Sequence, residues 1–254
     1  MAYLVMWVVI AIGASILAFV RGTQQARRRA ALIRLSHAVG LEYAASDLFD
    51  DLWEPFPLFG RGDARGIRNV VYGTRHGVEV RAFDYWYRRG ADRDKGAALA
   101  LIGGPLGLAA WLGFTRRFSC AVAGLPGSCP RLVVARKGTA GRLNELVEPE
   151  VPLESEEFTR RFHVRCDDPR FAVAFLDPRV MEALLAMPGS PTLMLSEDRM
   201  LLVTGELRPA ELIGLVEKVS ELARNVPRVL ASLYPLRPGF RPEDAPPRPR
   251  SLRF

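Results

Sequence analysis

The first twenty residues of the chain carry no charged side chain, and a cluster of positive charge follows at once. The uncharged run extends from Met1 to Val20, and the next nine residues include Arg21, Arg27, Arg28 and Arg29. A helix of 18 such residues is about 27 Å long, close to the roughly 30 Å hydrocarbon core of a bilayer. The run therefore predicts a transmembrane anchor over residues 1–21.

The flanks of this run predict its orientation. Tyr3 and Trp7 lie near one end, and such amphipathic rings are common at membrane interfaces. Positive residues resist translocation, so the arginine-rich side is expected in the cytoplasm. A cleaved signal peptide would carry its charges before the apolar stretch, and Phe19-Val20-Arg21 makes a poor cleavage site. We expect a single-pass protein of the cell membrane with a cytoplasmic body.

The net charge of +7 resides at the two ends of the chain. Residues 21–29 contribute +4 and residues 235–254 contribute +3, so the body at 30–234 has no net charge. A neutral body argues against a nucleic-acid partner, which requires a basic face. Within the body, segment 60–117 has six excess basic residues and segment 142–225 has six excess acidic ones. Either the basic half faces an anionic inner leaflet, or the two halves attract each other.

The periodicity of the body predicts an α+β fold, in which a mostly antiparallel sheet of about seven strands carries helices on one side. The expected N-terminal elements are a helix at 28–39 that continues from the anchor and ends at Gly40, a loop at 44–68, a hairpin of strands 67–74 and 78–87, and strands at 117–123 and 132–135. The expected C-terminal elements are a strand ending at Cys166, helices at 168–175 and 178–187, a hairpin of strands 192–196 and 200–204 across Glu197-Asp198-Arg199, and a long helix at 207–226.

We expect two parts, at 22–137 and 142–234, followed by a disordered tail at 235–254. The first part contains an apolar insert at 97–114, interrupted by Gly103-Gly104-Pro105. A hairpin that dips into the inner leaflet is the favoured interpretation. A second membrane span and a protein-packed or flexible loop remain alternatives. Aromatic and basic residues that bracket the insert are predicted to contact the membrane, namely Tyr85, Trp86, Tyr87, Trp111, Arg116 and Arg117.

One stretch resembles a known family. Glu157-Phe158, Phe162 and Val164 lead through Asp168 and Ala172 into a run formed by Leu176, Pro178, Met181 and Leu184. This pattern, over residues 157–204, resembles an uncharacterised family of bacterial, actinobacterial-type membrane-anchored proteins. A looser resemblance covers Gly60 to Tyr85, including Asn69-Val70 and Phe83-Asp84-Tyr85. The family has no established activity, so the resemblance implies no catalytic residues, and the insert at 97–114 departs from it.

The reactive residue types do not converge on a predicted catalytic or metal site. His37, His76 and His163 are far apart, and none has a partner at metal-ligand spacing. Gly60, Gly62 and Gly66 precede a strand rather than a helix, which favours backbone turns over a phosphate loop. Asp167 or Asp168 before Pro169 is typical of a helix N-cap. Buried structural roles are expected for Cys120, Cys129 and Cys166.

We therefore expect a non-catalytic module that binds lipid or a protein partner at the membrane, without a metal or cofactor. Two alternatives remain open. One is a membrane-proximal hydrolase that uses carboxylates such as Asp84, Asp167 or Asp168. The other is an accessory subunit of a membrane complex.

Overall fold

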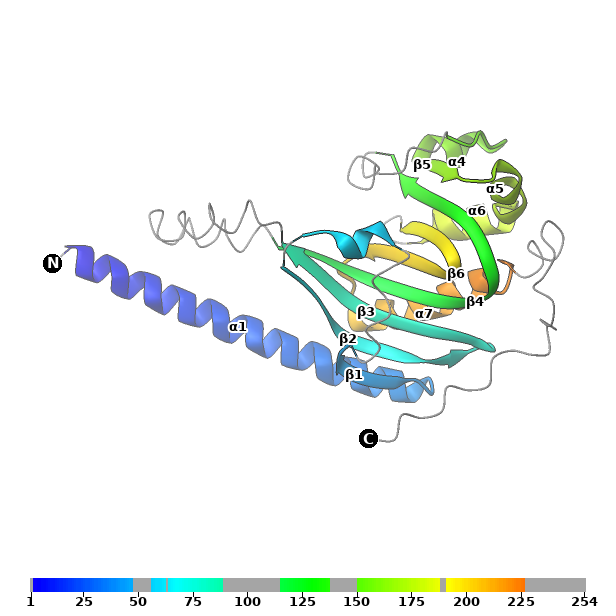
Figure 1. The fold of residues 1–254 in the computed structure, drawn as a ribbon. Helices are drawn as coiled ribbons and strands as arrows, with labels where there is room; N and C mark the ends of the chain where they lie inside the picture. Colours follow the sequence, from blue (N-terminus) through cyan, green and yellow to red (C-terminus); the bar gives the residue numbers. More distant parts are fainter. Residues whose placement is uncertain are drawn as a thin grey trace.

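The computed structural model describes residues 2–47, 56–62, 64–88, 115–137, 150–187 and 191–226. Its fold is α+β, with a six-stranded antiparallel sheet and several helices (Figure 1). In chain order the elements are α1 (Ala2–Ala38), β1 (Glu42–Ser46), the 3-10 helix η1 (Pro57–Gly60), β2 (Ala64–Arg75), β3 (Val78–Arg88), β4 (Arg116–Arg136), α4 (Glu156–Arg161), β5 (Phe162–Cys166), α5 (Pro169–Phe175), α6 (Pro178–Ala186), β6 (Thr192–Gly205) and α7 (Pro209–Ala223).

The predicted membrane anchor is corrected by the structure. Residues Ala2–Ala38 form one continuous helix of 37 residues, so the uncharged run is the first half of a longer element. Within the residues that the structure describes, no helix combines the length and the apolar character that crossing a bilayer requires. The second half of α1 passes through the arginines and packs beside the sheet, where Leu32 and Ser36 are fully buried. The single-pass arrangement with a cytoplasmic body is therefore not supported.

The helix α1 and the first hairpin agree with the sequence pattern. The helix continues through residues 28–38, and Gly40 then adopts a positive φ of 75°, a conformation that favours glycine after a helix. Strands β2 and β3 form the predicted hairpin, with its turn at His76-Gly77. The segment 44–68 is not simply a loop, because it contains parts of β1 and β2 as well as η1. The insert at 97–114 lies outside the described residues.

The central strand β4 joins the sheet together. Its first half pairs with β3, its second half pairs with β5, and β6 pairs along the opposite edge. The two strands predicted at 117–123 and 132–135 are therefore halves of one 21-residue strand. The predicted hairpin at 192–204 is wrong, because β6 runs straight through Glu197-Asp198-Arg199. Glu197 has a φ of 55° opposite Cys129, where the register of the two strands shifts. The extra residues at this shift belong to β4, so the polar triplet lies opposite a bulge in a long ladder.

The C-terminal helices are confirmed, and their starts have a local explanation. Asp168 accepts a hydrogen bond from the Arg170 N–H and caps α5, with Pro169 in the first turn. Asp177 caps α6 in the same way through the Val180 N–H. Such caps satisfy backbone donors that a helix end leaves unpaired. The apolar stripe of the last helix is buried as expected, at Leu212, Val216, Val219, Ala223 and Val226.

The two faces of the sheet carry different cores. The main core lies between the sheet and the helices, and it includes Ala82, Ala121 and Val216. The aromatic core lies on the opposite face, beneath η1, where Phe59 packs edge-on against Tyr85 with ring centroids 5.1 Å apart. Side chains of a strand alternate between its faces, so Tyr85 and Tyr87 point into the aromatic core. Asp84 and Trp86 consequently point to the face that α1 approaches.

Candidate functional site

A cleft separates α1 from the sheet face that presents Asp84 and Trp86. It has a volume of about 460 Å³ and lies between α1, the first four strands and Glu206. We call it the arginine cleft, because six arginines line it, namely Arg21, Arg28, Arg29, Arg68, Arg88 and Arg117. Asp84 and Glu206 are its only acidic lining residues among those that the structure describes. The aromatic residues along it include Tyr43, Trp86 and Phe118.

A β-bulge directs side chains of β2 into this cleft. Between the pairs Arg68–Asp84 and Val71–Ala82, β2 contains one residue more than β3. Asn69 stands in this irregular stretch with a φ of 55°, a conformation that asparagine adopts more readily than most residues. An inserted residue reverses the alternation of the strand. Arg68 therefore shares a face with Asp84, while Ile67 and Val70 stay in the aromatic core.

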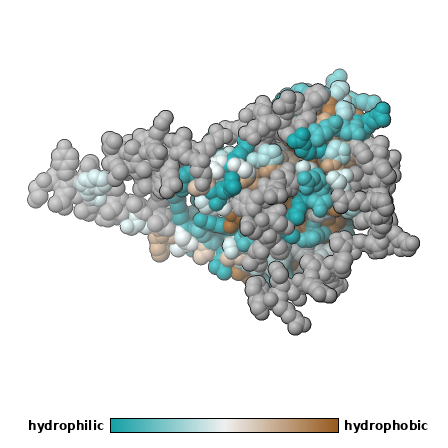
Figure 2. Space-filling model, in the orientation of Figure 1, coloured by the Kyte–Doolittle hydropathy of each residue, from teal (hydrophilic) through white to brown (hydrophobic). Residues whose placement is uncertain are grey.

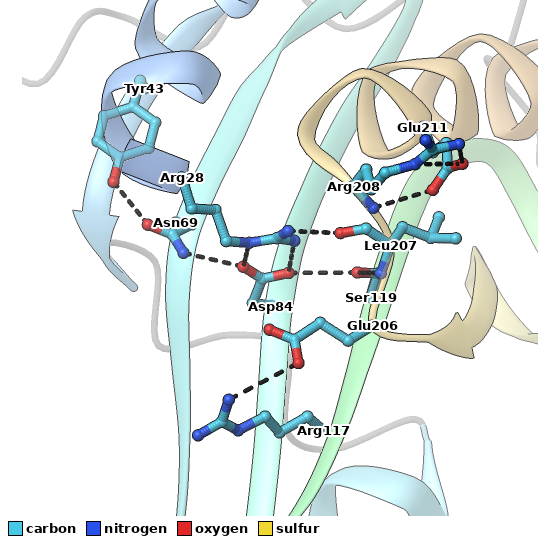
Figure 3. Close-up of polar contacts among 10 residues, drawn as sticks. All are labelled: Arg28, Tyr43, Asn69, Asp84, Arg117, Ser119, Glu206, Leu207, Arg208 and Glu211. Atoms are coloured by element: carbon cyan, nitrogen blue, oxygen red, sulfur yellow. Dashed lines mark hydrogen bonds and ion pairs between the residues drawn. The ribbon is translucent and has the colours of Figure 1, made fainter. Parts of the chain in front are cut away.

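Asp84 is the centre of a polar network at the base of the cleft (Figure 3). Its Oδ2 accepts hydrogen bonds from Arg28 Nε and Asn69 Nδ2, both at 2.8 Å. Its Oδ1 accepts from Arg28 Nη2 at 2.7 Å and from Ser119 Oγ at 3.2 Å. Both side chains of the Arg28–Asp84 pair are only 15% exposed. This bidentate pair thus fixes α1 against β3, and each carboxylate oxygen already accepts two hydrogen bonds.

The network extends outward on both sides of Asp84. Tyr43 donates its hydroxyl to Asn69 Oδ1 at 2.8 Å, which ties β1 to β2. Arg28 Nη1 donates to the Leu207 carbonyl, and the Leu207 N–H donates to Ser119 Oγ at 3.0 Å. Burial lowers the pKa of Arg28, but its hydrogen bond to Asp84 and the charges of Asp84 and Glu206 leave that pKa raised overall. Arg28 is therefore a permanent cation in a structural role.

The cations nearer the opening of the cleft are arranged differently. The Arg29 guanidinium lies over the Tyr43 ring, 6.0 Å from its centroid, and the Arg68 guanidinium lies over Trp86 at 5.4 Å. Arg117 Nη1 lies 3.7 Å from Glu206 Oε2. Stacking on an aromatic ring orients a guanidinium while its edge stays available for hydrogen bonds. The outer cleft therefore combines cationic and aromatic surfaces.

The structure brings together some of the predicted membrane-contact residues and separates others. Arg21, Arg28, Arg29, Trp86 and Arg117 line the arginine cleft, while Arg27 lines an adjoining hollow of about 520 Å³ between α1 and the start of α7. Tyr85 and Tyr87 are buried in the aromatic core. Arg116 is exposed at the start of β4, and Trp7 is 52% exposed on α1. The Tyr3 side chain and Trp111 lie outside the described residues.

The carboxylates proposed for a hydrolase do not share a site. Asp84 pairs with β4 residue Ser119, near the beginning of that strand. Asp167 lies at the end of β5 and contacts Arg131, while Asp168 caps α5. Within the described part of the chain, no three His, Cys, Asp or Glu side chains are placed to hold a metal. The hydrolase alternative therefore receives no geometric support.

The histidines and cysteines have structural surroundings. His76 and His163 pair with Glu217 and Glu150 at the surface. The three thiols are buried and unpaired with one another, as expected. Burial raises the pKa of Cys129 to about 12 and that of Cys166 to about 11. Because the thiolate is the nucleophilic form, these thiols are poorly suited to nucleophilic chemistry.

Sequence reasoning missed Tyr43, Arg68, Asn69 and Glu206 as residues of the site. Their separations along the chain exceed any local motif, since Arg28 and Leu207 are 179 residues apart. One signal was nevertheless present. The looser resemblance over Gly60 to Tyr85 included both Asn69 and Asp84, and these two side chains are hydrogen-bonded in the structure.

Comparisons with known proteins give one informative likeness. No family model and no curated protein matches the chain. The crystal structure of the mycobacterial trehalose monomycolate transport factor A, TtfA, is similar in fold, with a TM-score of 0.51 and 14% sequence identity. The similarity covers 82% of this chain and 97% of that chain. At this identity the likeness shows the fold alone, an α+β architecture shared with a transport factor.

Proposed function

We propose that this protein is a non-catalytic accessory factor that interacts with lipid, and that the arginine cleft is its binding site. The observation that carries this proposal is the difference between the base of the cleft and its opening. Its central carboxylate is saturated by four hydrogen bonds, while the cations and rings at its opening are not enclosed. A saturated carboxylate is a poor general base, whereas exposed cations beside aromatic rings suit an amphiphilic ligand.

Two further features support a lipid ligand. Several large apolar side chains on α1 are exposed, including Ile16 at 58% and Phe19 at 72%. By contrast, hydrophilic residues predominate among the described residues on the face of the body seen in Figure 2. The fold neighbour TtfA is named as a transport factor for a lipid, trehalose monomycolate. Its mycobacterial origin also agrees with the actinobacterial resemblance of this sequence.

The proposal is tested by flotation of the full chain with vesicles made from the lipids of the organism that produces it. We expect the protein to rise with the vesicles and the lipid to be recovered chemically unchanged. Trp86→Ala should reduce the floated fraction at least threefold, because it removes an aromatic surface of the cleft. Val173→Ala is the matched control, since Val173 is 57% exposed on α5 and remote from the cleft. Protein that stays at the bottom of the gradient, or lipid that is hydrolysed, contradicts the proposal.

A further inference from the structure

We propose that the arginine cleft recognises a phosphate-bearing, anionic headgroup, and that Arg29 and Arg68 are its principal ligands. This inference rests on the proposed lipid-binding function and names the chemistry of the ligand. It follows from the distribution of charge in the cleft, the orientation of two guanidinium groups and the rigidity of the surface behind them. Each of these is a property of the described residues alone.

The charge distribution leaves the opening of the cleft positive. Of the six lining arginines, Arg28 is neutralised by Asp84 at the base, and Glu206 lies near Arg117. Arg21, Arg29 and Arg68 have no acidic partner among the described residues. Three cations beside a partly enclosed surface repel one another, and an anion that binds between them relieves this repulsion.

The orientation of Arg29 and Arg68 suits a tetrahedral oxyanion. A guanidinium presents its N–H groups in a planar fork that bonds phosphate oxygens in pairs, which an ammonium group does not do. The Arg29 guanidinium lies over the Tyr43 ring and the Arg68 guanidinium over the Trp86 ring, and such cation–π contacts restrict the movement of each group. Because Arg29 belongs to α1 and Arg68 to β2, the two N–H forks come from different walls of the cleft.

The rings that support these arginines are themselves held in place. The Tyr43 hydroxyl is bonded to Asn69, which is bonded in turn to Asp84. The Trp86 indole lies against Gly66, where an added Cβ would come within 2.9 Å of Nε1. A surface that is ordered before binding loses little conformational entropy when the ligand arrives. The network at the base therefore orients the surface of the cleft before a ligand binds, while Asp84 itself makes no contact with the ligand.

The apolar side chains beside the cations indicate that the phosphate belongs to an amphiphile. Tyr43, Trp86 and Phe118 line the same cleft as the arginines. A volume of about 460 Å³ falls within the usual range of small-ligand sites, roughly 300–1,000 Å³. A cleft of this size accommodates a polar headgroup, with room at the open side for attached chains to leave.

The test compares two double variants of equal charge in the full chain. Arg29→Gln with Arg68→Gln removes the two proposed ligands. Arg34→Gln with Arg160→Gln removes two exposed arginines outside the cleft and serves as the control. Binding is measured by co-sedimentation with vesicles of phosphatidylcholine alone and with vesicles that also contain phosphatidylglycerol. Thermal melting checks that both variants remain folded.

We expect the unaltered protein to bind the anionic vesicles at least tenfold more tightly than the neutral ones. The cleft variant should lose at least tenfold in affinity for the anionic vesicles, and the control variant less than twofold. An equal loss in both variants, or equal binding of both vesicle types by the unaltered protein, overturns the headgroup inference. In either of those cases the proposed lipid interaction still stands.

A second arm identifies the source of the phosphate. Calorimetry with glycerol 3-phosphate tests whether the headgroup binds without its chains. If neither vesicle type binds but glycerol 3-phosphate does so through Arg29 and Arg68, the phosphate site is supported and the lipid proposal fails. If neither vesicles nor glycerol 3-phosphate bind, both proposals are overturned.

Discussion

Two groups of aspartates in this protein have the same chemistry and opposite surroundings. Asp84 lies at the base of the arginine cleft, where it gathers side chains from α1, β2 and β4. Asp167 and Asp168 lie at the end of β5. Asp167 pairs with the exposed Arg131, and Asp168 accepts a hydrogen bond from neighbouring backbone. The carboxylates of both groups have hydrogen-bond or ion-pair partners, yet Asp84 joins segments that are far apart in the chain. The difference shows that burial and sequence distance, rather than residue type, decide how much a carboxylate stabilises the fold.

Asp84→Ala is the strongest test of this comparison. The Arg28 side chain is only 15% exposed in the unaltered protein, and the substitution removes its bidentate partner; an uncompensated buried charge is costly. We expect the free energy of unfolding to fall by about 3 kcal/mol in chemical denaturation. Asp167→Ala is the control, because its partner Arg131 is 54% exposed, and a change below about 0.5 kcal/mol is expected. Equal losses from the two variants would contradict the distinction.

A double-mutant cycle on Arg28 and Asp84 isolates the interaction itself. The two single alanine variants should together lower the free energy of unfolding by more than the double variant does. The difference, which is the coupling energy, should be about 2 kcal/mol. The same cycle on Arg131 and Asp167 should give less than about 0.5 kcal/mol. Additive effects at Arg28 and Asp84 would mean that α1 is held by its apolar contacts alone.

Asp168→Ala separates local capping from long-range pairing. Loss of the hydrogen bond to the Arg170 N–H leaves a backbone donor of α5 unsatisfied. The expected destabilisation is about 1 kcal/mol, between the effects at Asp84 and Asp167. Asp168→Asn should recover most of it, because an amide oxygen also accepts at the N-cap position. Failure of asparagine to recover stability would point to a role for charge instead.

The raised pKa of Tyr72 leads us to expect a smaller, pH-dependent contribution to folding stability near the edge of the sheet. A hydrogen bond to the facing Glu42 side chain, followed by burial and the Glu42 charge, raises the pKa of Tyr72 to about 12. An unfolded tyrosine ionises near 10. The folded state therefore gains stability that is complete below about pH 10 and is lost as pH rises toward 12. Tyr72→Phe should flatten the stability profile in this window and remove one tyrosinate step near pH 12 from the absorbance titration.

The sequence predicted those elements whose signals are local. Helix α5 follows from an aspartate before a proline, and the hairpin of β2 and β3 follows from alternation around Arg75-His76-Gly77. The prediction was wrong where a polar stretch between two apolar runs is compatible with two different structures. Glu197-Asp198-Arg199 can form a turn or continue a strand, and pairing with the bulged part of β4 keeps it in the strand. The continuation of the uncharged run into a helix through residue 38 agrees with the prediction, but the membrane span predicted for the run is not supported among the described residues.

The candidate site was only partly predictable for the same reason. The sequence predicts membrane contact for arginines of α1 and for Trp86, and the structure gathers several of these residues in one cleft. Their relation to Tyr43, Arg68 and Asn69 was invisible, because a single inserted residue in β2 decides which side chains face α1. No periodicity in the sequence indicates where such an insertion falls.

By itself, the sequence determined the α+β class, the helix caps, the burial of the cysteines and the neutral charge of the body. These depend on composition, on alternation and on contacts between residues a few positions apart. The tertiary structure alone decided that β4 and β6 are single long strands, that α1 docks beside the sheet and that Asp84 anchors it. These outcomes depend on pairings between residues tens to hundreds of positions apart. The free energy of such pairings belongs to the folded arrangement, so no local stretch of the chain encodes it.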